Sequence, residues 1–186
     1  MRGGSYEGKF KIYCHEELAD TITQLCMLTL VKKFTSFLGD RILIKKVKDG
    51  EEKNAAGMKL TFFDIHSTKT KQFGFRAGFE DGTRLTCLGD EPYKETARPY
   101  AEGCDWLLSE AFCLDRDKEI FHPYEKHHST ALDAGRLAQQ LHVKNLVLYH
   151  TEDTCLSERK ESYTKEAARC FDGNIFVPLD LERIRL

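Results

Sequence analysis

The sequence lacks several features that would each have assigned it to a class of protein. No apolar run approaches the roughly 18 residues that a membrane-spanning helix needs, and the longest, 25–31, is interrupted by Thr29. The first residues carry no hydrophobic stretch of the kind found in secretory signals. Lys and Arg number 28 against 30 Asp and Glu, so no excess of positive charge indicates a protein that binds nucleic acid by bulk electrostatics. We therefore expect a soluble, cytoplasmic protein with no membrane partner.

Several common motifs are also missing. The seven cysteines include no C-x-x-C pair, which excludes a zinc ribbon and a thioredoxin-type site. Most of them lie in apolar segments, and we expect them to be small buried hydrophobic residues without a chemical role. The glycines do not have the spacing of a G-x-G-x-x-G or P-loop motif, and no G-x-S-x-G sequence occurs. A nucleotide cradle and a serine-hydrolase elbow are therefore not expected.

What is present indicates one folded α/β domain over residues 1–186. Hydrophobic residues make up 41% of the 186 residues and aromatic residues 11%, which is enough for a core. Helical spacing predicts helices at 16–38, 93–101 and 157–171, and another that begins after Ser129 and Thr130 and carries an apolar stripe from Ala134 to Leu141. Strands are expected at 9–14, 41–47, 58–65, 72–79, 83–88, 104–108, 145–149 and 174–179. The alternation predicts a mixed sheet.

Four polar residues follow predicted strands at equivalent points. They are His66, Asp90, Glu110 and His150. Ligand sites on α/β sheets gather outside the carboxyl ends of the strands, so these side chains are candidates to converge there. Imidazole and carboxylate together suit zinc, manganese or iron rather than calcium. The alternative is that each is an ordinary polar residue at the start of a loop.

A further histidine, His128, stands just before the helix that Ser129 and Thr130 are expected to cap. Beside a metal pocket, a histidine at such a helix entry is a candidate general acid for a leaving alkoxide. Without that pocket, the simpler interpretation is a solvated loop followed by a capping residue.

Several of these residues belong to short motifs that occur in order along the chain. The motifs are Phe63-Asp64-Ile65-His66 with Phe73-Gly74-Phe75-Arg76, then Leu88-Gly89-Asp90, then 105–112 (DWLLSEAF), then His128-Ser129-Thr130, and finally Leu146-Val147-Leu148-Tyr149-His150. Their order and spacing resemble those of the metallo-β-lactamase superfamily in its ribonuclease Z-like branch. Ser109 stands where that branch usually has a histidine.

This resemblance implies an αββα sandwich and a metal-dependent hydrolase. By the family pattern Asp90 bridges two metals, while His66 and His150 each bind one. The resemblance assigns His128 the role of proton donor, and we expect Glu110 to orient a ligand or His128. The implied reaction is hydrolysis of a phosphodiester or related ester through a metal-bound hydroxide. The implied cofactor is zinc, with two ions in the family pattern and with manganese or iron as alternatives.

The departures from the family pattern suggest a second interpretation. The signature H-x-H-x-D-H does not occur in these 186 residues. We therefore expect the N-terminal strands of the fold to be missing and the domain to be N-terminally incomplete, with a homodimer partner or another chain covering exposed sheet. The alternative function is a non-catalytic remnant of the fold that acts as a binding or dimerisation module. Retention of the later motifs in register favours the hydrolase.

Two departures concern the substrate. Ribonuclease Z enzymes carry a long tRNA-binding arm between the third motif and the Gly-Asp motif, whereas here only a hairpin across Asp81-Gly82 fills that interval. After His150 the chain is acidic, at Glu152 and Asp153, where that family has a Ser and an Arg-Tyr. These features make tRNA a doubtful substrate and favour a small-molecule or phosphodiester substrate.

Overall fold

The computed structural model describes residues 8–154 and 156–186. The chain divides into two compact units, residues 1–49 and 50–186, and each is considered by itself. That the two units make up one domain stays a prediction. Residues 1–7, where no secretory signal is expected, and Cys155 lie outside the described residues.

The first unit is a β-α-β arrangement. Strands β1 (Phe10–Cys14) and β2 (Ile42–Lys46) pair in parallel. Helices α1 (Glu16–Thr29) and α2 (Lys32–Thr35) connect them, as two parallel neighbours require. His15 caps α1, because its Nδ1 accepts a hydrogen bond from the Leu18 N–H over 3.3 Å.

The expectation of one continuous helix over 16–38 is wrong. Helix α1 ends at Thr29, and the next residue, Leu30, has extended backbone angles of φ −93° and ψ 143°. The Thr29 hydroxyl donates back to the Leu25 carbonyl over 2.6 Å. A β-branched residue that bonds its own helix in this way weakens the continuing turn.

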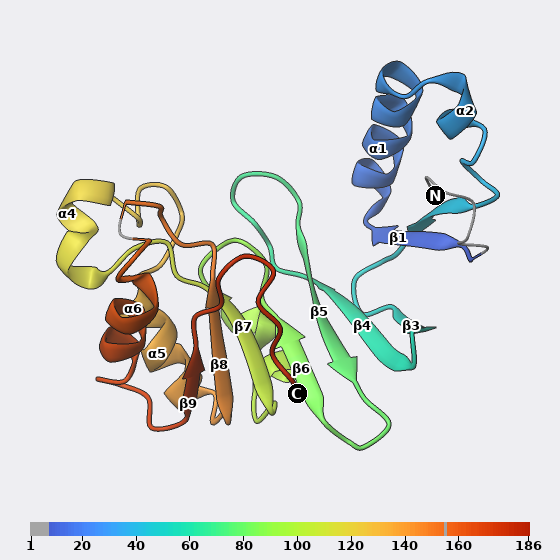
Figure 1. Ribbon diagram of the computed structural model, residues 1–186. Helices are drawn as coiled ribbons and strands as arrows, with labels where there is room; N and C mark the ends of the chain where they lie inside the picture. The colour runs from blue at the N-terminus through green and yellow to red at the C-terminus, as the bar shows by residue number, and fades with distance from the viewer. Residues whose placement is uncertain (1–7, 155) are drawn as a thin grey trace. The chain divides into compact units, whose positions relative to one another are not determined.

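The second unit contains a seven-stranded sheet with the order β3-β4-β5-β6-β7-β8-β9 (Figure 1). The strands are β3 (Glu52–Ala55), β4 (Met58–Asp64), β5 (Phe73–Gly78), β6 (Arg84–Cys87), β7 (Trp106–Glu110), β8 (Asn145–Tyr149) and β9 (Asn174–Phe176). Pairing is antiparallel from β3 to β6 and parallel from β6 to β9. The predicted mixed sheet is confirmed.

Strand β3 was not predicted. Its sequence, Glu-Lys-Asn-Ala, has none of the apolar alternation of a half-buried strand. It lies at the edge of the sheet and pairs only with β4 among the described strands, so its residues need no core-facing side chains.

The direction of the strands gathers four of their ends at one edge. Because β4 is antiparallel to β5 and β5 is antiparallel to β6, β4 runs in the same direction as β6. Strands β7 and β8 continue in that direction. The segments that follow β4, β6, β7 and β8 therefore begin along the same edge of the sheet.

Among its described residues, the second unit also contains six helical elements. The short elements are η1 (Glu95–Ala97), α3 (Arg98–Ala101), η2 (Asp115–Asp117) and α4 (Lys118–Phe121), and the longer ones are α5 (Ala131–Gln140) and α6 (Arg159–Ala167). Of these, α3, α5 and α6 contact strands of the sheet. Helices α5 and α6 contact each other beside β8 and β9 (Figure 1). Thr130 begins α5 through a capping box with Asp133, which confirms the predicted helix start. The fully buried Leu107, Leu146 and Tyr163 belong to the core between these layers.

None of the described helices is both long enough and apolar enough to cross a bilayer. A cytoplasmic location and a homodimer stay predictions.

Candidate metal centre at the carboxyl ends of the strands

Asp90 follows β6 through a turn that only glycine fits. Gly89 has a φ of +82°, and a Cβ atom there would lie 2.9 Å from Ile65 Cδ1. The Gly89 carbonyl accepts a hydrogen bond from the Tyr149 hydroxyl, which ties this turn to the end of β8. The glycine therefore sets the direction in which the chain delivers Asp90.

His66 and His150 leave their strands in the same unusual conformation. His66 has a φ of 53° and His150 a φ of 56°, in the left-handed region that non-glycine residues seldom adopt. The backbone N–H of His66 donates to Asp64 Oδ1 over 2.7 Å, and Lys94 donates to the His66 carbonyl. Residues held in such conformations are frequent at functional sites.

Glu110 is the last residue of β7 rather than a residue beyond the strand, and its side chain is only 1% exposed. Its Oε1 accepts hydrogen bonds from the Ser129 N–H, over 2.7 Å, and from the Ser129 hydroxyl. These bonds connect β7 to the segment that leads into α5.

His128 is buried, at 7% exposure, rather than solvated. Its N–H donates to the Pro123 carbonyl over 2.8 Å, and its ring stacks on Phe112 with 5.1 Å between ring centroids. The next residues continue alongside β7, where the Phe112 N–H donates to the Ser129 carbonyl over 2.9 Å. The His128 ring is therefore fixed at the strand ends by packing on both sides.

Three of the candidate residues converge. Asp90, His128 and His150 each offer one ligand atom, and these atoms lie within 4.8 Å of one another. His150 Nε2 is 3.0 Å from Asp90 Oδ1, and the His128 and His150 ring centroids are 4.9 Å apart. His66, although it follows β4 at the same edge, is exposed and is not part of this group.

The polar atoms of this group fit a metal ion. Asp90 Oδ1, Glu110 Oε2 and His128 Nδ1 are buried and make no hydrogen bond, although Asp90 Oδ1 lies 3.0 Å from His150 Nε2. Among the residues that the structure describes, only Arg159 Nε is likewise buried without a hydrogen bond. Buried polar atoms are normally satisfied, because leaving one unpaired costs about 1–3 kcal/mol. Carboxylate oxygens and an imidazole nitrogen are suitable ligands for zinc and related ions. The residues present are therefore compatible with a bound metal.

The site shifts the pKa values of two of its groups in opposite directions. Burial raises the pKa of Glu110 to about 7, although the hydrogen bonds from Ser129 oppose this shift. Burial, with the nearby positive charge of Lys69 and the His150 ring, lowers the pKa of His128. Both shifts favour the neutral forms of these side chains, as expected for desolvated groups.

Sequence reasoning missed two residues that contact this site. Lys69 Nζ lies 3.2 Å from His128 Nε2. Glu91 is 3% exposed and accepts hydrogen bonds from the Ser67 hydroxyl over 2.5 Å and the Thr68 N–H over 3.0 Å, which fixes the loop that carries Lys69. The position of Glu91 directly after Asp90 was the only available signal, because loop conformation cannot be read from strand or helix periodicity.

A cavity of about 320 Å³ adjoins the site at His128. Helix α5, the segment around Tyr93 and the loop carrying Tyr124 form its walls. Its lining consists of Pro92, Tyr93, Tyr124, His128, Ser129, Asp133, Ala134, Arg136, Leu137 and Gln140. Mostly apolar walls with a few polar groups are typical of small-molecule sites.

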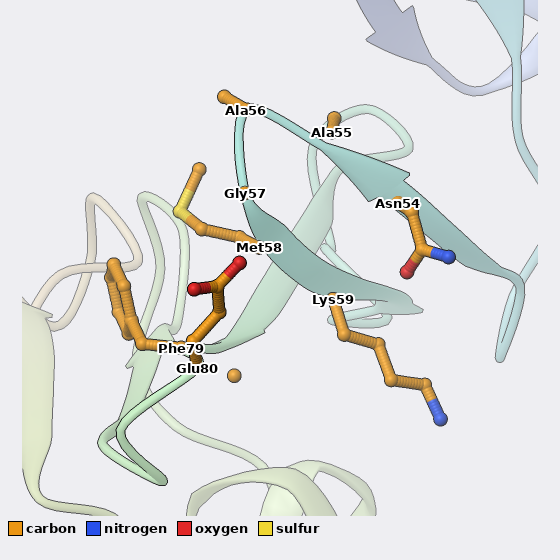
Figure 2. A pocket seen from close by; sticks show the side chains of 9 residues that line it. Asn54, Ala55, Ala56, Gly57, Met58, Lys59, Phe79 and Glu80 are labelled. Atoms are coloured by element: carbon orange, nitrogen blue, oxygen red, sulfur yellow. The ribbon is translucent and has the colours of Figure 1, made fainter.

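A second hollow lies on the β3–β4 hairpin, away from the strand ends (Figure 2). Residues 54–59 and 78–80 line it. Met58, Phe79 and Glu80 lie on one side of it, while Lys59 extends away from them. It offers one carboxylate, Glu80, and no histidine or cysteine, so it lacks the groups for metal or acid–base chemistry.

Comparison with curated proteins identifies ribonuclease Z sequences as relatives. The chain is 37% identical to ribonuclease Z of Thermobifida fusca over 90 residues, which are 48% of this chain and 28% of that protein. It is 29% identical to ribonuclease Z of Streptococcus suis over 206 aligned positions, which cover 95% of this chain and 63% of that protein. The chain thus spans less than two thirds of the length of these relatives. No protein-family model matches the sequence.

Solved structures with the same fold cover most of the chain. The metallo-β-lactamase fold protein YhfI of Bacillus subtilis aligns over 94% of this chain and 65% of its own, with a TM-score of 0.70 and 21% identity. Human tRNase Z, short form, aligns over 95% of this chain and 67% of its own, with a TM-score of 0.67 and 16% identity. The Zn²⁺-bound PqqB of Methylobacterium extorquens aligns over 93% of this chain and 63% of its own, with a TM-score of 0.64 and 16% identity. These likenesses confirm the predicted fold.

Proposed function

Because this chain is a ribonuclease Z-like member of the metallo-β-lactamase superfamily, we propose that it is a metal-dependent hydrolase that cleaves a phosphodiester. The observation that carries the proposal is the convergence of Asp90, His128 and His150, whose ligand atoms lie within 4.8 Å of one another.

Asp90 and His150 would hold the metal of the described site, and His66, which follows β4 at the same edge, is a further proposed ligand. Zinc is the proposed ion, with manganese or iron as alternatives, since imidazole and carboxylate suit all three. When bound, the metal would lower the pKa of a coordinated water and polarise the ester. A second copy of the chain is the proposed partner.

His128 and Glu110 are the proposed acid–base pair. Lys69 donates toward His128 Nε2, so the imidazole proton is assigned to Nδ1, which faces Glu110 Oε2 at 3.5 Å. To donate a proton, His128 takes the other tautomer, with its proton on Nε2 and with Nδ1 accepting from protonated Glu110. The Nε2 proton then passes to the leaving alkoxide and the Glu110 proton passes to Nδ1, which leaves a neutral imidazole and a Glu110 carboxylate. The pKa of Glu110, near 7, suits it to hold that proton at neutral pH.

The surroundings of the site favour a small substrate. The adjoining cavity of about 320 Å³ accepts the organic group of an ester next to His128. The β5–β6 connection is a tight turn, closed by the Phe79 N–H to Thr83 carbonyl bond of 2.9 Å, and provides no arm for a large RNA. We therefore propose a small phosphodiester rather than precursor tRNA.

The test is metal content together with hydrolysis. Protein purified without chelators or metal-affinity columns is analysed for zinc, iron and manganese, and is assayed with bis(p-nitrophenyl) phosphate. Bound metal and hydrolysis that a chelator abolishes and added metal restores support the proposal. Protein that holds no metal at micromolar concentration, and gains no activity when metal is added, contradicts it.

A further inference from the structure

Lys69 approaches the reactive end of His128 from the loop that follows β4. Its Nζ lies 3.2 Å from His128 Nε2, the nitrogen that faces away from Glu110. The ammonium has only donors, so it contacts the imidazole through the lone pair of Nε2. A leaving oxygen that approaches Nε2 therefore lies beside the ammonium of Lys69.

The charge of Lys69 is not neutralised by a nearby carboxylate. Among residues 8–154 and 156–186, no Asp or Glu oxygen lies within 4.0 Å of its Nζ, and its ammonium contacts the uncharged ring of His128. The side chain is also exposed. An uncompensated, accessible cation at a site lined by Asp90 and Glu110 has an anion as its natural ligand.

Hydrogen bonds to Glu91, and not the Lys69 side chain, hold the loop that carries Lys69 in place. Glu91 accepts hydrogen bonds from the Ser67 hydroxyl, the Thr68 N–H and, over 3.4 Å, the Lys69 N–H. These bonds outweigh the effect of burial and lower the pKa of Glu91, so the carboxylate is charged at neutral pH. The backbone of Lys69 is therefore anchored, while its ammonium remains available for a ligand.

We infer that Lys69 binds a non-bridging oxygen of the substrate's phosphoryl group, next to the leaving oxygen, and so selects anionic phosphate esters over uncharged carboxylic esters. This inference rests on the proposed hydrolase function. The carboxylate of Asp90 repels an anion, and a fixed ammonium at this point offsets that repulsion. A neutral acyl ester places no comparable negative charge beside Lys69 in its ground state.

The matched variants are Lys69→Met, Lys69→Arg and, as a control, Lys71→Met. Methionine keeps the length and apolar volume of the side chain but has no charge. Lys71 lies in the same loop, and its Nζ is 5.8 Å from the centroid of the Phe73 ring rather than at His128. Metal-loaded proteins are assayed with bis(p-nitrophenyl) phosphate and with p-nitrophenyl acetate, which share a leaving group and differ in charge.

Loss of a charge-assisted hydrogen bond of this kind lowers kcat/KM by about tenfold to hundredfold. We expect that loss for the phosphodiester in Lys69→Met, no more than a twofold change for the acetate ester, partial retention in Lys69→Arg, and no effect in Lys71→Met. An equal loss for both esters would mean that Lys69 acts only through His128, and an unchanged phosphodiester rate would mean that it does not act at all; either overturns the inference.

Binding of inorganic phosphate, measured by isothermal titration calorimetry on the same metal-loaded proteins, separates this inference from the proposed function. Weaker phosphate binding in Lys69→Met than in Lys71→Met supports the anion-binding role even if no ester is hydrolysed. Equal phosphate affinity in the two variants overturns it, whatever the hydrolytic activity.

Discussion

Glu110 Oε2 and His128 Nδ1 face each other at 3.5 Å, and neither atom has a hydrogen-bond partner. Burial raises the pKa of Glu110 to about 7 and lowers that of His128, so both shifts favour the neutral forms of the two facing groups. Two interacting groups in this situation titrate as a pair rather than separately. This relationship is the basis of the acid–base role proposed for them.

Replacing Glu110 with Gln tests that role. Gln keeps an oxygen that accepts the bonds from Ser129, so the fold is retained, but it cannot supply a proton to His128. We expect phosphodiester hydrolysis to fall by about 10²- to 10⁴-fold with unchanged metal content. The exposed Glu119→Gln is the control. Wild-type turnover in Glu110→Gln would exclude the carboxyl from the reaction.

The two histidines of the group should differ in their effect on metal binding. His150→Ala and Asp90→Asn each remove a proposed ligand, and we expect losses of metal affinity beyond the tenfold to hundredfold that loss of an outer partner costs. His128→Ala should lose turnover and keep its metal. Asp81→Asn, in the β5–β6 turn, serves as the control. The measurement is the metal content of each variant by elemental analysis after dialysis. A His128→Ala protein without metal would show that His128 is a ligand rather than the proton donor.

The convergence of the strand ends was predictable, whereas the contacts within it were only partly so. Parallel strands bring their carboxyl ends to one edge, and the predicted strands over 83–88 and 145–149 were sufficient to place Asp90 and His150 there. The predicted strand 104–108 ended two residues early, because Ser109 and Glu110 are polar residues that the strand buries. Carboxyl side chains are normally exposed to solvent, so a pattern of apolar and polar residues does not predict that Glu110 is buried.

The contacts that the sequence did not predict are made by residues in loops. His66 was grouped with the other three residues because it follows β4, yet the grouped ligand atoms belong to Asp90, His128 and His150. Lys69 reaches His128 because Glu91 fixes the intervening loop, an interaction between residues 22 to 24 positions apart. Side-chain hydrogen bonds of this kind carry no local sequence signature.

Steric contacts explain why the Phe73-Gly74-Phe75-Arg76 motif has a glycine at its second position, and this explanation can be tested. A Cβ atom at Gly74 would lie 2.6 Å from the Cys87 carbonyl oxygen and 2.6 Å from the Phe63 ring. The backbone oxygen cannot move without disturbing the β5–β6 pairing. We expect Gly74→Ala to lower the free energy of unfolding by about 1–3 kcal/mol in urea denaturation. Gly78→Ala is the control, because its nearest contact would be an ordinary 3.8 Å. Equal stability of the two variants would contradict this packing.

Glu166 predicts a dependence of stability on pH. Its Oε1 accepts bonds from the Asp115 N–H over 2.8 Å and the Leu132 N–H over 3.1 Å, and its side chain connects α6 to two other elements. Burial nevertheless raises its pKa above the usual 4.5, although these bonds oppose the shift. A group whose pKa is raised by folding stabilises the folded protein at pH values below its pKa in the unfolded chain. This contribution is lost as the pH rises through its pKa in the folded protein.

Glu166→Gln should therefore unfold at higher urea concentration than the wild type at pH 8, with the difference shrinking toward pH 4.5. Gln keeps the accepting oxygen and carries no charge. Glu161→Gln, on the same helix, should unfold at lower urea concentration than the wild type at pH 8, because the ion pair with Lys165 lowers the pKa of Glu161.

Glu166→Ala, which loses both bonds, should be destabilised by about 1–3 kcal/mol. The measurement uses metal-free protein, since metal binding has its own pH dependence. A pH-independent difference between Glu166→Gln and the wild type would mean that the carboxyl does not titrate between these pH values, and the raised pKa would then be wrong.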